Sequence, residues 1–356
     1  MLLGEISVRV LYQLKRRREG KRPKYLLYTP VQWNNADSKT AAYAEHPQIS
    51  YVKRANNTST RYPSNNLGYS GRREIMLEKE PGTIRIFVAG DSTVESNDID
   101  QKAPFDPELT WPRVMESELN RLSNGNIKFE VINAAVLGYS SIESLADFQL
   151  RGIYLKPDFV IIHHNINEAW YSQACADFKP DSSHCRIAVH FPKISPLPDI
   201  KISYLYQYAK KRFARYEDAM LPYIVNEIPF KSDPAPTLEK QQGFENNLRA
   251  FCAIAKLHGI VPILMPWNFI PGAVTTPFGH NFNPAQLNQF IELLNQNNRS
   301  TQKISQEFSE SHWIDPGKFE RHHFRDHDWI HWSRGGLIEM GERMALEFSR
   351  MLDSRH

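Results

Sequence analysis

The feature that most constrains this chain is a regular alternation of short β-rich runs with longer helical patterns, which starts at residue 84. The run Phe159-Val160-Ile161-Ile162 is apolar without interruption, as in strands buried on both faces of a parallel sheet. Helices joined to such strands by right-handed crossovers cover both faces, so the pattern predicts a doubly wound α/β fold. The β-rich runs are residues 84–89, 128–132, 159–162, 260–265 and 313–314, and the helical patterns are 111–123, 141–153, 236–258, 284–309 and 335–353.

Two segments depart from this alternation. Residues 26–83 are rich in Asn, Ser, Thr, Tyr and Pro, and they predict an extended lead-in with a turn at Asn66-Leu67-Gly68-Tyr69. Residues 169–235 carry seven prolines, which argues against long regular elements. An insertion of this length forms either a lid or substrate-binding wall, or a structural cap without substrate contact. We therefore predict an N-terminal part, residues 1–83, packed on a domain of residues 84–356 that holds the insertion.

The composition excludes several classes of protein. No stretch approaches 18 consecutive apolar residues, so no transmembrane helix is expected. A net charge of +3 without a zinc-finger or RNA-recognition pattern gives no argument for nucleic-acid binding. Residues 1–25 alone carry a charge of +6, and apolar residues recur there at helical spacing. This segment is either an amphipathic helix on an anionic membrane surface, through residues 2–24, or a helix packed on its own domain.

Three cysteines exclude a disulfide-stapled miniprotein. Cys175 and Cys185 could pair in an oxidising compartment, whereas Cys252 lies in an apolar helical pattern typical of a core. The charged residues of the opening follow its apolar residues, which is the reverse of a secretory signal. We therefore expect free thiols and a cytoplasmic location, with membrane association as the alternative.

Polar clusters follow three of the predicted strands, at the sheet edge where ligands of open α/β folds bind. In Gly90-Asp91-Ser92-Thr93, a serine on a strand-to-helix turn exposes its hydroxyl, or it simply caps a helix. Gly138 lets its backbone N–H approach a ligand, or it is a plain turn glycine. The amides of Asn165 and Asn167 can donate to an oxyanion, or they stabilise a turn.

A fourth cluster precedes the last helical pattern. Asp328 lies three residues before His331, and Ser333 and Gly336 follow. A carboxylate at this spacing can hold one imidazole nitrogen, so that the other nitrogen accepts a serine proton. The alternative is a surface loop with unrelated charges.

The order and placement of the four clusters resemble those of the SGNH (GDSL) hydrolase superfamily over residues 84–353. The resemblance implies a three-layer α/β/α, flavodoxin-like fold with a parallel central sheet, and a serine hydrolase. In that case Ser92 is the nucleophile, His331 its general base and Asp328 the group that orients His331.

The same resemblance implies an oxyanion hole made by the backbone N–H groups of Ser92 and Gly138 and the side chain of Asn167. The third cluster departs from the family pattern Gly-x-Asn-Asp, because Asn165 stands at the glycine position and Glu168 at the aspartate position. Asn165 therefore competes with Asn167 for the role of donor.

Four histidines lie close together in the fourth cluster, and a zinc site is the alternative use for them. Asp328 already accounts for His331 and no His-Glu-x-x-His motif is present, so we predict neither a metal nor a cofactor. His164 is expected to be a neighbour of the site and not a reacting group. The four histidines are His322, His323, His327 and His331.

The function predicted from these residues is that of a serine esterase, which removes a short acyl group such as acetyl through an acyl-enzyme on Ser92. The lead-in resembles a subgroup associated with acylated bacterial polysaccharides, so the expected partner is a small-molecule or saccharide ester, as for a carbohydrate deacetylase. One alternative is an O-acyltransferase that uses the same triad. Another is a non-catalytic binding protein on an esterase scaffold. The sequence leaves the oligomeric state open.

Overall fold

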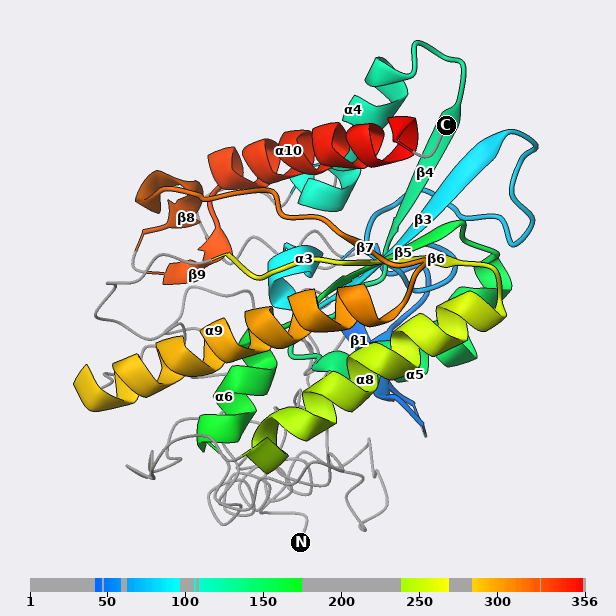
Figure 1. The fold of residues 1–356 in the computed structure, drawn as a ribbon. Coiled ribbons are helices and arrows are strands. Elements are labelled where there is room, and N and C mark those ends of the chain that lie inside the picture. The colour runs from blue at the N-terminus through cyan, green and yellow to red at the C-terminus, as the bar shows by residue number, and fades with distance from the viewer. Residues whose placement is uncertain are drawn as a thin grey trace, which may run out of the picture.

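The structure is a computed structural model, and it describes residues 42–46, 48–58, 63–96, 106, 109–174, 238–268, 284–326 and 328–354. Its centre is a five-stranded sheet in the order β4-β3-β5-β6-β7, with every neighbouring pair parallel (Figure 1). In chain order this is 2-1-3-4-5, the flavodoxin-like arrangement of a doubly wound fold. The strands are β3 (Thr83–Gly90), β4 (Lys128–Asn133), β5 (Phe159–His163), β6 (Val261–Leu264) and β7 (His312–Trp313).

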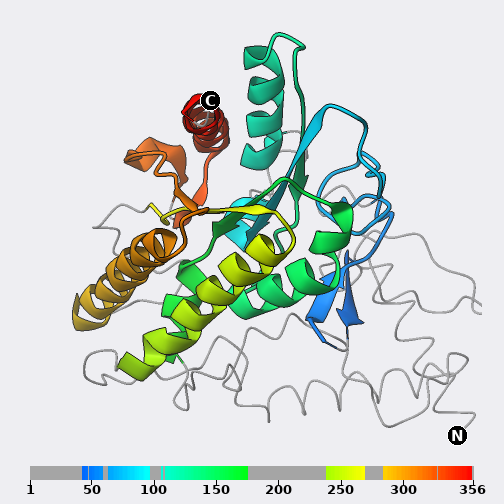
Figure 2. The same cartoon turned by 45° about the vertical axis from the view of Figure 1, so that its right-hand side comes forward.

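Helices cover both faces of this sheet, so the predicted α/β fold class is confirmed. Figure 2 shows α4 and α10 on one face and α5 and α8 on the other. Along β3, Ile86 and Val88 pack in the first layer and Phe87 packs in the second, as the alternation of a strand requires. The helices are α3 (Ser92–Glu95), α4 (Trp111–Leu122), α5 (Ser141–Leu150), α6 (Ile166–Ala174), α8 (Leu238–Leu257), α9 (Pro284–Glu307) and α10 (Arg334–Asp353), with 3-10 turns η2 (Gly152–Leu155) and η3 (Arg321–His323).

The predicted elements agree with these bounds to within a few residues, with two corrections. The pattern at 141–153 is not one helix, because Arg151 leaves the helical region at φ −133° and η2 follows. The predicted start of the insertion at residue 169 is wrong, because α6 continues to Ala174. Ala169, Trp170 and Tyr171 are buried, so this stretch belongs to the packed core. The rest of the insertion, 175–235, lies outside the described residues.

The lead-in contributes an antiparallel hairpin of β1 (Tyr43–His46) and β2 (Ser50–Lys53). Its tyrosines Tyr43 and Tyr51 pack with Val136 and Tyr139, which follow β4. The turn predicted at residues 66–69 is present. The N-terminal residues 2–24 lie outside the described part of the chain, and the division at residue 83 stays a prediction.

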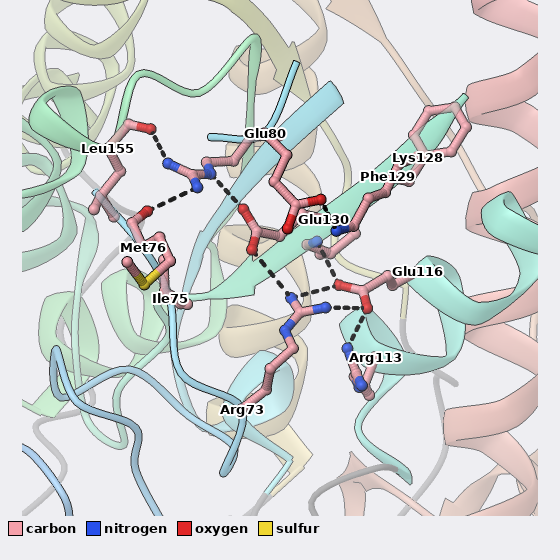
Figure 3. Close-up of polar contacts among 12 residues, drawn as sticks. Arg73, Ile75, Met76, Glu80, Arg113, Glu116, Lys128, Phe129, Glu130 and Leu155 are labelled. Carbon is pink, nitrogen blue, oxygen red and sulfur yellow. Dashed lines mark hydrogen bonds and ion pairs between the residues drawn. The ribbon is translucent and has the colours of Figure 1, made fainter. Parts of the chain in front are cut away.

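An ion-pair network ties the lead-in to the amino-terminal half of the sheet (Figure 3). The buried guanidinium of Arg85 on β3 pairs with Glu130 on β4 and donates to the carbonyls of Met76 and Leu155. Arg73 pairs with Glu116 of α4 through both nitrogens. These contacts lie away from the strand ends that carry the polar clusters.

A second antiparallel pair, β8 (Phe324–Arg325) and β9 (Asp328–Trp332), leads into α10. Ser333 caps α10 by accepting the Gly336 N–H at 3.1 Å. A Cβ at Gly336 would overlap the His323 carbonyl, so the glycine lets α10 start directly against η3. Within the described ranges, no helix combines the length and apolar character needed to cross a bilayer.

Candidate active site

Ser92 stands at the first position of α3, immediately beyond the carboxyl end of β3. The preceding Asp91 caps the helix, because its Oδ1 accepts the Thr93 N–H and the Thr93 hydroxyl, both at 2.8 Å. Ser92 is half-buried, whereas Asp91 and Thr93 are buried. The strand-to-helix turn therefore presents the serine hydroxyl and uses the flanking residues to fix the backbone.

The structure brings His331 to this hydroxyl from 239 positions further along the chain. The Nε2 atom of His331 lies 2.9 Å from Ser92 Oγ, which is hydrogen-bond distance. His331 lies on β9 and is 7% exposed, so its side chain is buried. A neutral imidazole in this position can accept the hydroxyl proton.

Asp328 is the first residue of β9 and pairs in register with Arg325 of β8. Its backbone therefore lies on the same strand as His331. The side chain of Asp328 is outside the described part of the structure, and its role in orienting His331 stays a prediction.

Gly138 lies in the turn after β4 and has φ +80°, a conformation that favours glycine. Its carbonyl accepts the Tyr171 hydroxyl at 3.0 Å, and the next carbonyl, that of Tyr139, accepts the Asn167 amide at 2.7 Å. The Gly138 N–H has no hydrogen-bond partner among the described residues. The turn is thus held firmly while the N–H of interest is left available.

The two candidate asparagines are separated by their contacts. Asn165 donates to the Leu294 carbonyl and to Asn298 Oδ1, both at 2.8 Å, and accepts from Asn297 at 2.9 Å. Its side chain is therefore committed to α9, and the alternative that it competes as a donor is not supported. Asn167 uses one amide hydrogen on Tyr139, and its second amide hydrogen has no partner in the described part of the chain.

Two buried carboxylates lie next to candidate site residues in the sequence: Asp91 precedes Ser92, and Glu168 follows Asn167. Burial raises the pKa of Asp91 to about 6, against the opposing effect of the hydrogen bonds from Thr93. Burial likewise raises the pKa of Glu168 to about 7, against its bond from the Ser141 N–H. Asp91 Oδ2 and Glu168 Oε2 have no hydrogen-bond partner within the described ranges. Both side chains therefore ionise less readily than they would in water.

Glu168→Gln tests this electrostatic setting through stability. The folded pKa of Glu168, about 7, lies above its ordinary value of 4.5, so the folded protein binds this proton more tightly than the unfolded chain. Wild-type stability is then lost as pH rises from about 4.5 to 7, while the glutamine variant is spared. We expect the unfolding free energy of the variant, relative to wild type, to rise by about 3 kcal/mol between pH 4.5 and 8. Urea unfolding measures it, and a difference independent of pH would contradict it.

The other histidines of the region have different surroundings. Burial lowers the pKa of His163 and His164 to about 3, so both rings are neutral at neutral pH. The ring centroids of His322 and His323 lie 3.9 Å apart. Among the described residues, no three His, Cys, Asp or Glu side chains form a group able to hold a metal ion. His327 lies outside them.

Cys252 is fully buried in α8, and burial raises the pKa of its thiol to about 12, so the prediction of a core cysteine is confirmed. Cys175 and Cys185 lie outside the described residues, and their pairing stays open.

Sequence reasoning missed the residues that hold the Gly138 turn, chiefly Tyr171 and Glu95. No local pattern marks them, because their partners are distant in the chain.

No protein-family model matches the chain, and no curated protein matches it. A GDSL-like lipase from Bacteroides thetaiotaomicron is 11% identical, with a TM-score of 0.41 over 76% of this chain and 89% of that one.

An acetylxylan esterase from Geobacillus stearothermophilus is 15% identical, with a TM-score of 0.41 over 74% of this chain and 93% of that one. An α/β hydrolase from the metagenome of Lake Arreo is 12% identical, with a TM-score of 0.43 over 75% and 95%.

Proposed function

We propose that this protein is a serine esterase that cleaves a short acyl ester through an acyl-enzyme on Ser92. The observation that carries the proposal is the 2.9 Å contact between His331 Nε2 and Ser92 Oγ. The imidazole takes the hydroxyl proton while Oγ attacks the ester carbonyl carbon. The proton then passes from His331 to the leaving alcohol. Water, deprotonated by the same imidazole, then attacks the acyl-enzyme, and His331 returns the proton to Ser92 Oγ as the acid is released.

Each attack places negative charge on the former carbonyl oxygen. Three donors support its stabilisation: the N–H groups of Ser92 and Gly138 and the second amide hydrogen of Asn167. None of the three has a hydrogen-bond partner among the described residues. Donors that need no reorganisation during the reaction lower the barrier most. Asp328, on the same strand as His331, is proposed to hold the other imidazole nitrogen.

Within this class, we propose that the acyl group is short, such as acetyl, and that the alcohol is a carbohydrate hydroxyl, as the sequence resemblance implies. The same residues can also pass the acyl group to a second hydroxyl, which is the chemistry of an O-acyltransferase. The two reactions differ only in whether water or a sugar attacks the acyl-enzyme.

One assay separates these functions. The purified protein is incubated with p-nitrophenyl acetate and a xylo-oligosaccharide, and free acetate and acetylated sugar are both quantified by mass spectrometry. We expect p-nitrophenol and acetate in equal amounts with wild type. Acetylated sugar in place of acetate would make the protein a transferase. No turnover above the rate of a protein-free blank would leave a binding protein and overturn the proposal.

A further inference from the structure

The turn that carries Gly138 is held by the N-terminal hairpin, which lies outside the α/β core. We propose that Tyr51 and the buried pair Lys53–Glu95 are positioning residues, which aim the Gly138 N–H at the oxyanion. This inference rests on the proposed esterase function and adds a role for a part of the chain that precedes the predicted hydrolase region.

Tyr51 holds the peptide group that joins Leu137 to Gly138. The Tyr51 hydroxyl donates to the Leu137 carbonyl at 2.6 Å. That carbonyl belongs to the same peptide group as the Gly138 N–H. Because a trans peptide is planar and its C=O and N–H point in opposite directions, a partner that holds the oxygen also sets the direction of the N–H. Tyr51 therefore orients the proposed donor without touching the substrate.

Glu95 holds the preceding peptide group, which joins Val136 to Leu137. The Leu137 N–H donates to the carboxylate of Glu95, which is fully buried and lies three residues after Ser92 on α3. Glu95 thus connects the helix that carries the proposed nucleophile with the turn that carries the proposed donor. A change at Glu95 alters the distance between these two parts of the site.

The charge of Glu95 is balanced by a buried lysine. Its carboxylate pairs with the Lys53 ammonium of β2, and both side chains are at most 2% exposed. The Tyr43 hydroxyl of β1 also donates to Glu95, at 3.1 Å. Because burying an ion pair costs desolvation energy, such pairs are poor sources of stability. A use that fits this pair is to fix one geometry between the hairpin, α3 and the turn.

Aromatic packing also fixes the turn that carries Gly138. The rings of Tyr51 and Tyr139 meet edge to face at 5.1 Å, and the Tyr139 hydroxyl donates back to the Tyr51 carbonyl. On the other side of the turn, Tyr171 holds the Gly138 carbonyl at 3.0 Å. The hairpin and α6 therefore grip the turn from two sides.

The test uses Tyr51→Phe and Glu95→Gln, with Glu130→Gln as the matched control. Glu130 also pairs with a buried cation, Arg85, but in the network of Figure 3 near the amino-terminal ends of the strands. All three variants change a part-buried polar contact, and only the first two change one near Gly138. For Tyr51→Phe and Glu95→Gln we expect kcat on p-nitrophenyl acetate to fall between about 10-fold and 100-fold with KM within about twofold. For Glu130→Gln we expect kcat to be unchanged.

A second readout separates positioning from simple loss of stability. Phenylboronic acid forms a tetrahedral, anionic adduct with an active serine, so its inhibition constant reports on oxyanion donors. At temperatures well below the unfolding midpoint, the inhibition constant of Tyr51→Phe should rise by the same factor by which its kcat falls. An unchanged kcat in folded Tyr51→Phe, or an equal fall in Glu130→Gln, would overturn the positioning role. Should Tyr51→Phe not fold, Glu95→Gln decides alone. A wild type without esterase activity would instead overturn the proposed function.

Discussion

Ser92→Ala is expected to lower kcat for p-nitrophenyl acetate by a factor of about 10⁴ to 10⁶ while leaving the fold intact. The change removes one oxygen, and the cap formed by Asp91 and Thr93 does not depend on it. A residual rate above water remains, because the proposed oxyanion donors are still present. Steady-state kinetics give the loss and circular dichroism gives the unfolding midpoint, which should match that of wild type. A variant that kept more than about 1% of wild-type kcat would show that another group is the nucleophile.

His331→Ala is expected to lose a comparable factor, about 10⁴ to 10⁶ in kcat, because His331 is the base that the described residues place within hydrogen-bond distance of Ser92 Oγ. The matched control is His322→Ala, since His322 is exposed and precedes the same strand pair. Its kcat should stay within about twofold of wild type.

Groups that act as one unit are not additive, so the double variant Ser92→Ala with His331→Ala should be about as active as either single variant. A double variant whose loss equals the product of the two single losses would mean that the residues act independently. That outcome would contradict the proposed proton transfer between them.

The main elements of the sheet could be predicted from the sequence because their signals are local. Residues 159–162 are apolar throughout, and β5 is buried throughout, as a central parallel strand requires. The predicted insertion starts inside α6, although its first proline, Pro180, comes only after this helix has ended at Ala174. Its Trp170 and Tyr171 are buried by other elements, and no local pattern reveals that.

The candidate site shows the same division. Ser92 could be placed at the ligand-binding edge from its position after a strand of the parallel sheet. His331 lies on β9, outside that sheet, so its contact with Ser92 was predicted only through the family resemblance. The choice between Asn165 and Asn167 could not be made from the sequence, because the partners of Asn165 lie on α9, about 130 positions away. Tyr51 is 86 positions from Leu137, so its contact could be found only in the fold.

If the Ser92 hydroxyl is an activated nucleophile, a fluorophosphonate should label it covalently. The protein is treated with the reagent, its intact mass is measured, and the modified peptide is mapped. We expect one adduct, on Ser92, which forms in wild type and in His322→Ala and is absent from Ser92→Ala. An unlabelled Ser92 in folded wild-type protein, or an adduct on a different residue, would contradict it.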